Sequence, residues 1–93
     1  MFIGVVIGNV WATKKDEQLN GMKLMVVQRI DPADGKRHES IVAADRVGAG
    51  IGEQVMVVTG SSARMALASP NIPMDAAIVG ILDEVEITLT KGL

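Results

Sequence analysis

The chain has 93 residues, of which 48% are hydrophobic and 2% aromatic, and its formal net charge at pH 7 is −2. This length allows a single domain over residues 1–93 with a small core, so an isolated subunit is expected to be only marginally stable. The absence of cysteine excludes a disulfide framework and a thiolate metal site. We therefore expect contacts between subunits to supply part of the stability.

Charge and composition also exclude several kinds of partner. Neither the acidic balance nor the two aromatic residues, Phe2 and Trp11, suits a surface that binds nucleic acid. The longest apolar runs, such as Ala76 to Leu82, are too short to cross a bilayer, and no basic residue precedes Lys14 as a secretory signal would require. We expect a cytoplasmic protein with no nucleic-acid partner and no membrane partner.

The chain begins with a predicted strand over Met1 to Thr13, rich in Val and Ile. If side chains alternate along it, Gly4 and Gly8 share a face with Val6 and Val10, which leaves that face nearly bare. Glycine inside a strand marks a bend, a bulge or the close approach of another backbone. We expect all three in a small, strongly curved barrel.

Two further strands follow, each bounded by a tight turn. Asn20-Gly21 provides the first turn, where glycine tolerates positive φ, and Asp31 to Gly35 provides the second. The second strand is predicted over Met22 to Ile30, and the third returns from Lys36 or Arg37 to Asp45. The second turn makes these two strands a hairpin.

A glycine-rich loop, a fourth strand and a helix come next. The loop is Gly48-Ala49-Gly50-Ile51-Gly52, and the strand is Gln54 to Thr59, which is short and mostly apolar. Ser61 or Ser62 can cap a helix predicted over Ala63 to about Ala68. Ser69-Pro70 ends that helix, because the residue before a proline disfavours the helical conformation.

The last part of the chain predicts one or two strands. Asp75 to Leu82 is very apolar, and beyond Asp83 the alternation of Val85, Ile87 and Leu89 with polar residues predicts a strand with one polar face. A bend or bulge at Asp83 would let one long strand serve two partners. The fold class is mostly β: a small OB-like β-barrel of five to six strands with one short helix between strands four and five.

Residues that carry chemistry do not converge in this sequence. The spacing Gly48-x-Gly50-x-Gly52 differs from that of a dinucleotide loop and precedes a strand, so a bend or close packing against a neighbour is favoured over phosphate binding. His38 is the sole histidine, and the carboxylate pairs Asp16-Glu17 and Asp83-Glu84 point in different directions on either kind of element. We expect no catalytic residue, no cofactor and no metal site.

The segment Gly60-Ser61-Ser62-Ala63-Arg64 is the most informative polar turn. A serine nucleophile would need an adjacent base, and no G-x-S-x-G elbow occurs in the chain, so helix capping is the preferred role. Free amides at the start of this helix could face an anion if they lined an opening. Arg64 is expected to pair with a carboxylate within or between subunits.

Five motifs in chain order resemble those of a known family. They are Gly8-Asn9-Val10-Trp11-Ala12-Thr13-Lys14, Leu19-x-Gly21-x-Lys23-Leu24, Ala43-x-Asp45-x-Val47-Gly48-Ala49-Gly50-x-Gly52-Glu53-x-Val55, Gly60-Ser61-Ser62-Ala63-Arg64 and Asp75-Ala76-x-Ile78-Val79-Gly80-Ile81-x-Asp83. Together they resemble the EutN/CcmL family, the vertex proteins of bacterial microcompartment shells. These proteins are found in carboxysomes and in ethanolamine-, propanediol- and other catabolic organelles.

The resemblance implies a homopentamer, located in the shell of a microcompartment, that caps the vertices of a polyhedron whose facets are tiled by hexameric shell proteins. It also implies a narrow pore on the fivefold axis. A closed ring requires each subunit to show two different patches to its neighbours. We expect Gly60, Ser61 and Ser62 near the axis, and subunit contacts at Gly4, Gly8, Gly48, Gly50, Gly52, Arg64 and Asp75.

An alternative interpretation is an OB-type binding module for single-stranded nucleic acid or an oligosaccharide. Such a module needs a basic, aromatic face, and the composition does not provide one. A small enzyme would need a nucleophile with a base or a set of ligands, which the sequence also lacks. The structural function is therefore preferred.

Overall fold

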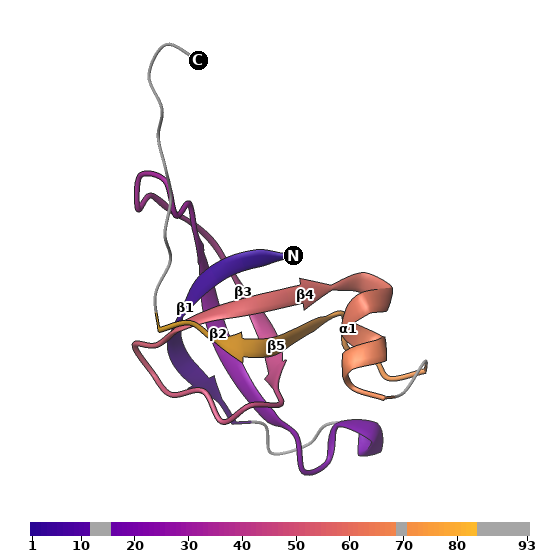
Figure 1. Cartoon of the computed structure of the whole chain (residues 1–93). Coiled ribbons are helices and arrows are strands. Elements are labelled where there is room, and N and C mark those ends of the chain that lie inside the picture. Colours follow the sequence, from indigo (N-terminus) through magenta and orange to yellow (C-terminus); the bar gives the residue numbers. More distant parts are fainter. Residues whose placement is uncertain (12–15, 69–70, 84–93) are drawn as a thin grey trace.

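A computed structural model describes residues 1–11, 16–68 and 71–83. Within these ranges, five strands close into a barrel in the order β1-β2-β3-β5-β4 (Figure 1). The elements are β1 (Phe2–Val10), the 3-10 turn η1 (Glu17–Leu19), β2 (Lys23–Ile30), β3 (Arg37–Asp45), β4 (Gln54–Thr59), α1 (Gly60–Ala66) and β5 (Ala76–Ile81). The predicted small barrel with one short α-helix between strands four and five is confirmed.

Strand β1 pairs with β2 on one side and with β4 on the other, which closes the barrel. Its first part pairs with β4, and most of its length pairs with β2, antiparallel in both cases. The register with β2 shifts between Val6 and Gly8, so the expected bulge lies at Ile7. A bulge bends the strand and increases its twist, which lets one strand serve both partners.

The bulge also overturns one prediction about this strand. Val6 is fully buried inside the barrel, and Ile7 is 43% exposed. Gly8 pairs with Val26, which lies between the buried Met25 and Val27 and therefore points outward. Gly8 is thus on the outer face and not on the face of Gly4 and Val6, because an inserted residue reverses the alternation that follows it.

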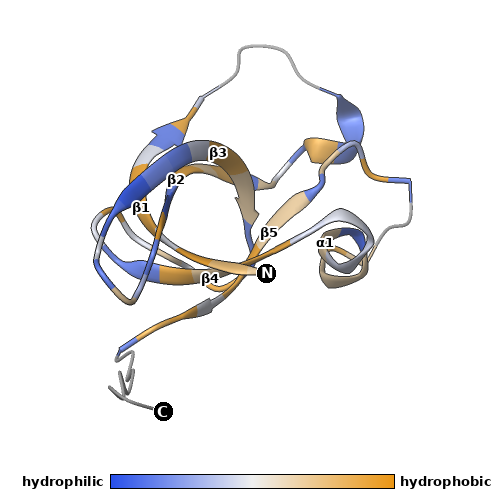
Figure 2. Ribbon diagram, turned by 90° about the horizontal axis from the view of Figure 1, so that it is seen from above, coloured by the Kyte–Doolittle hydropathy of each residue, from blue (hydrophilic) through white to orange (hydrophobic). Residues whose placement is uncertain are grey.

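The hydrophobic residues form two clusters on the two sides of the barrel wall. The inner cluster consists of Val6, Met25, Val27, Ala43, Ala49, Val55, Val57, Ala76 and Ile78. Figure 2 shows the strands curving around the barrel interior, with α1 beside them. The outer cluster, which includes residues of α1, consists of Leu24, Ala44, Val58, Ala63, Leu67, Ile72 and Ala77. Strand β5 contributes to both clusters, which explains its nearly continuous apolar sequence.

The turns follow the predicted chemistry. Gly21 and Gly35 have φ angles of +79° and +73°, which glycine adopts without a steric penalty. The Asp31 carboxylate accepts a hydrogen bond from the Ala33 amide at 2.9 Å, and the Asp34 carboxylate accepts one from the Lys36 amide at 2.8 Å. The hairpin between β2 and β3 is therefore fixed by its own side chains.

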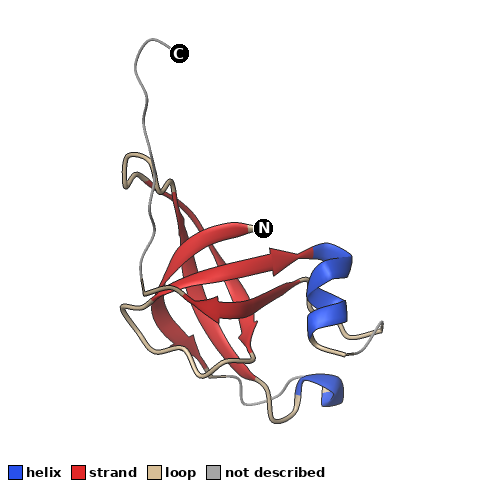
Figure 3. Cartoon of the chain, in the orientation of Figure 1, coloured by secondary structure: helices blue, strands red, loops and turns tan. Residues whose placement is uncertain are grey.

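Both helices lie on the same side of the barrel (Figure 3). No helix among the described residues is long and apolar enough to cross a membrane. Strand β5 ends at Ile81 and the backbone bends at Asp83, which confirms the predicted bend. The strand predicted beyond it falls on residues 84–90, which lie outside the described residues.

Candidate assembly surface

The glycine-rich loop between β3 and β4 is held by hydrogen bonds to its own chain. The Asp45 carboxylate accepts hydrogen bonds from the amides of Val47 and Ala49, at 3.0 and 2.8 Å. The Glu53 carboxylate accepts one from the Gly50 amide at 2.6 Å. Lys23 donates from Nζ to the Ala49 carbonyl at 3.1 Å. Loop amides that would cradle a phosphate are therefore already bonded to carboxylates, which argues against anion binding here.

The same loop is also attached to β1. The Gly52 amide donates to the Val6 carbonyl at 2.8 Å, and the Val6 amide donates to the Glu53 carbonyl at 3.0 Å. Ala49 is fully buried in the inner cluster. The loop is an ordered part of the barrel wall, as the expected role in a bend requires.

The glycines proposed as subunit contacts divide into those that the fold requires and those that it does not. A Cβ on Gly4 would lie 2.5 Å from Cγ1 of Val27 and 2.8 Å from the Gln28 carbonyl oxygen, so the barrel itself excludes a side chain there. Gly48 and Gly52 have φ angles of +79° and +91°, which side chains rarely adopt.

Gly8 meets no such obstacle among the described residues. A Cβ there would meet only Val26, at an ordinary 3.9 Å, and no positive φ is involved. Gly50 is intermediate, because its Cβ would lie 3.2 Å from a terminal oxygen of the flexible Glu53 side chain. The described part of the subunit therefore leaves room beside Gly8, next to the bulge at Ile7.

The segment Gly60-Ser61-Ser62 begins α1, which corrects the predicted helix. The helix starts at Gly60 rather than Ala63 and ends at Ala66, and the residue that precedes it, Thr59, makes no side-chain capping bond. Gly60 has a φ of +61°, so the chain turns from β4 directly into the helix. The serines therefore lie exposed in the first turn instead of capping it.

The structure brings two of the predicted residues together. The Gly60 amide donates to the Asp75 carbonyl at 2.8 Å, which joins the start of α1 to the start of β5. The Asp75 side chain is exposed beside this junction. Arg64 is partly buried and makes no salt bridge with any described residue, so the expectation of a carboxylate partner within the subunit is not met in these ranges.

An apolar area lies on the outer face of the β1-β2-β3 sheet. In register across the three strands are Gly8, Val26 and Val42, of which Val42 is 41% exposed. We call these three residues, Gly8, Val26 and Val42, the outer sheet patch. On α1 itself the exposed residues are Ser61, Ser62 and Met65, and Met65 is 79% exposed.

One end of the barrel carries a polar cluster that the sequence did not indicate. The Arg29 guanidinium lies 5.5 Å from the centre of the Phe2 ring and 3.7 Å from the Glu39 carboxylate. Both charged side chains are more than half exposed, so the ion pair contributes little to stability. Only the strand pairing places these residues together, because they come from β1, β2 and β3.

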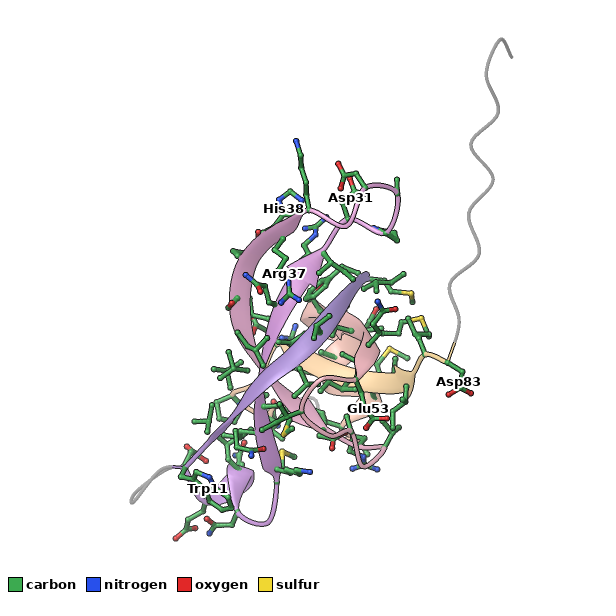
Figure 4. The ribbon with its side chains drawn as sticks, turned by 90° about the vertical axis from the view of Figure 1, so that its left-hand side faces the viewer. Trp11, Asp31, Arg37, His38, Glu53 and Asp83 are labelled. Atoms are coloured by element: carbon green, nitrogen blue, oxygen red, sulfur yellow. The ribbon has the colours of Figure 1, made fainter. Side chains whose placement is uncertain are left out.

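The labelled polar residues of Figure 4 are spread over the barrel. His38, Arg37 and Asp31 lie at the hairpin end of the barrel, and Trp11 lies at the opposite end (Figure 4). Among residues 1–11, 16–68 and 71–83, no three His, Asp or Glu side chains are close enough together to hold a metal ion. What this surface offers is exposed apolar area and small residues, which suit contact with another protein.

A family model described as "Ethanolamine utilisation protein EutN/carboxysome" matches residues 1–83. The chain belongs to the EutN/CcmL family. The shell vertex protein GrpN of Rhodospirillum rubrum is 46% identical over 86 residues, covering 92% of this chain and 97% of GrpN. The carboxysome shell vertex protein CcmL of Synechococcus elongatus is 42% identical over 87 residues, covering 94% of this chain and 88% of CcmL.

Solved structures of the family agree with the fold. A structure of the ethanolamine utilization protein EutN matches with a TM-score of 0.88 and 42% identity, covering 94% of this chain and 91% of that one. The structure described as the GrpN pentameric microcompartment shell protein matches with a TM-score of 0.84 and 46% identity, covering 95% and 100%. The predicted family resemblance is confirmed.

Proposed function

We propose that this chain is a structural protein that forms a homopentamer and caps the vertices of a bacterial microcompartment shell, with residues 1–93 acting as one vertex domain. The observation that carries the proposal is the near-full-length similarity to GrpN, which is 46% identical and whose solved structure is described as pentameric. The other named relatives, EutN and CcmL, are also shell vertex proteins. All of these are structural proteins, which favours a role without catalysis.

Physical features of the subunit support this proposal. The chain is small, has no cysteine to form a covalent cross-link, and leaves apolar side chains such as Val42 and Met65 exposed. In a ring of identical subunits, each subunit contacts its two neighbours through two unlike patches. The ring closes when the rotation between neighbours brings the last subunit back to the first. The outer sheet patch and the exposed face of α1 are suited to be those two patches.

The glycine comparison supports Gly8 as a point of close approach by a neighbour. Gly8 lies on the outer sheet patch, and among the described residues a side chain there would meet only Val26, at an ordinary distance. A neighbouring backbone or a projecting side chain, such as Met65 of the next subunit, could sit against it. We assign Gly8 to the subunit contact, with Arg64 and Asp75 at the margin of α1, whereas Gly4, Gly48 and Gly52 are first of all requirements of the fold.

The start of α1 is our candidate for the lining of the axial opening. Gly60, Ser61 and Ser62 lie at a β-to-α junction, and the two serines are exposed and small. Small polar side chains allow five copies of a segment to approach one axis without a steric or desolvation penalty. We also propose that the rim of the ring contacts hexameric shell proteins.

Assembly of shells tests vertex capping directly. Facet-forming hexameric shell proteins would be expressed with and without this chain, and the particles would be imaged by electron microscopy. We expect closed polyhedra with the chain, and particles open at their vertices without it. Particles that close equally well in its absence would contradict the proposal.

The alternative of an OB-type binding module gains no support from the described surface. Of the two aromatic residues, Phe2 lies under Arg29, and Trp11 is 91% exposed at the far end of the barrel. A platform that stacks bases or sugars needs several aromatic side chains on one face.

A further inference from the structure

Strand β3 has one side without a strand partner over most of its length. It pairs with β2 from Arg37 to Asp45, but with β5 only at Ala44 and Asp45. Within the described part of the chain, no strand pairs with the other side of Arg37–Ala43. An unpaired edge presents a row of amides and carbonyls that can accept an added strand. We call residues Arg37–Ala43 the open edge.

The open edge borders a hollow of about 410 Å³. Glu39, Ile41 and Val42 of β3 line one side of it. The remaining lining residues are Met1, Phe2, Arg29, Thr59, Asp75 and Ala76. The hollow therefore lies where β3 and β5 diverge, and its lining combines apolar side chains with the charged residues Arg29, Glu39 and Asp75.

The sequence contains one segment that suits this edge. Residues 84–90, Glu-Val-Glu-Ile-Thr-Leu-Thr, alternate apolar and polar side chains, the pattern of a strand with one buried face. This segment lies outside the described residues. It is seven residues long, as is the open edge, and it would extend about 23 Å as a strand at about 3.3 Å per residue.

Strand β5 leads away from the open edge of its own subunit. Strand β5 runs parallel to β3 and pairs with it only up to Ile78. Beyond β5, the Leu82 amide donates to the carbonyl of Gln54, which is the first residue of β4. Returning from Asp83 to the level of Ala76, where the open edge begins, takes about 23 Å, the whole length of the segment. Figure 4 shows Asp83 on the opposite side of the barrel from Arg37 and His38.

We propose that residues 84–90 of one subunit add as a strand to the open edge of a neighbouring subunit in the ring. The proposal rests on the pentamer proposed above, which supplies the second copy. Val85, Ile87 and Leu89 would cover Ile41 and the hollow, and the main chain would satisfy the unpaired amides of β3. Lys36 and Arg37 at the start of the edge are exposed and complement the charges of Glu84 and Glu86.

Disulfide trapping in the full-length chain tests the contact, because the chain has no native cysteine. Ser40→Cys places a thiol on the exposed part of the open edge. It would be combined in turn with Glu86→Cys, Thr88→Cys and Thr90→Cys, to allow for the register. Oxidation should give a covalent ladder of up to five chains on a non-reducing gel in at least one of these double variants, and no ladder beyond dimers in any single variant.

The matched control replaces Ser40→Cys with Gln18→Cys, an exposed position on η1. We expect at least a fivefold lower yield of ladder with this control. Equal ladders with both edge and control cysteines would contradict the proposal, as would a disulfide within one chain. Rings of five without any cross-link would overturn the added strand and leave the pentamer in place, whereas the absence of rings would overturn the pentamer itself.

Hydrogen exchange provides a second measurement in assembled rings. Ile87→Asp should speed exchange of the amides between residues 38 and 43 by tenfold or more, because a charge on the apolar face releases the added strand. Thr88→Asp carries the same charge on the polar face and should leave exchange unchanged. Equal exchange in wild type and Ile87→Asp would overturn the proposal.

Discussion

The two glycines of β1, Gly4 and Gly8, lie in one strand but on opposite faces of the barrel wall. Gly4 faces the barrel interior, where a Cβ would clash with Val27 and with the Gln28 backbone. Gly8 lies on the outer face, where a Cβ would meet only an ordinary contact. The difference teaches that one glycine is needed to close the barrel and that the other is available for a neighbouring subunit. The predictions below test this division.

The largest effect is expected for Gly4→Leu. The nearest obstacle at position 4 includes backbone, which cannot move as a side-chain end can. Overpacking of a core costs about 1–3 kcal/mol or more, which is a large part of the stability of a small domain. We expect loss of soluble protein or a collapse of the free energy of unfolding measured by denaturant titration. A variant with wild-type stability would contradict this account, because it would show that the barrel interior can accommodate a side chain at position 4.

Gly8→Leu should separate assembly from folding. The side chain would project from the outer sheet patch, so the circular dichroism spectrum of the subunit should stay native. The ring should dissociate at concentrations at which the wild type is assembled, with a loss of at least tenfold in apparent affinity. Rings of normal stability in size-exclusion chromatography with light scattering would remove Gly8 from the contact.

A smaller loss is expected in the glycine-rich loop. Gly48→Ala forces a side chain into a φ of +79° and should lower the free energy of unfolding by about 1–2 kcal/mol. Gly50→Ala meets only the movable end of Glu53 and should cost clearly less in thermal denaturation. If Gly50→Ala instead disrupts assembly while unfolding is unaffected, Gly50 belongs with Gly8 among the contact residues.

The smallest effect is expected for the exposed ion pair at the barrel end. Arg29→Met removes the charge opposite Glu39, but both side chains are more than half exposed. In dissociated subunits, a double-mutant cycle with Glu39→Gln should give a coupling of less than about 1 kcal/mol. A coupling well above this value in dissociated subunits would contradict the exposed pair, whereas a larger coupling in assembled rings would agree with a neighbour covering the hollow.

Much of the fold could be predicted from the sequence, because turn chemistry and strand patterns are local. The turns at Gly21 and Gly35 and the strand Gln54–Thr59 are confirmed as predicted. The helix was misplaced because the sequence does not reveal that Gly60 turns the chain directly out of β4. The face of Gly8 was wrong because the glycines predicted a bulge but not its position, and a bulge at Ile7 reverses the alternation before Gly8.

The candidate surface was less predictable, since it depends on long-range register. The offset between β3 and β5, which creates the open edge, is set by pairing across the whole barrel. The cluster of Phe2, Arg29 and Glu39 likewise comes from three strands. Sequence motifs could indicate the family and the candidate glycines, but not which glycines the subunit itself requires.

The central claim is that five copies of this chain form a closed ring. Native mass spectrometry of the full-length protein at low micromolar concentration measures the stoichiometry directly. We predict a single dominant species of five subunits, which Gly8→Leu shifts toward monomers. A stable monomer as the dominant species of the wild-type protein would contradict the account.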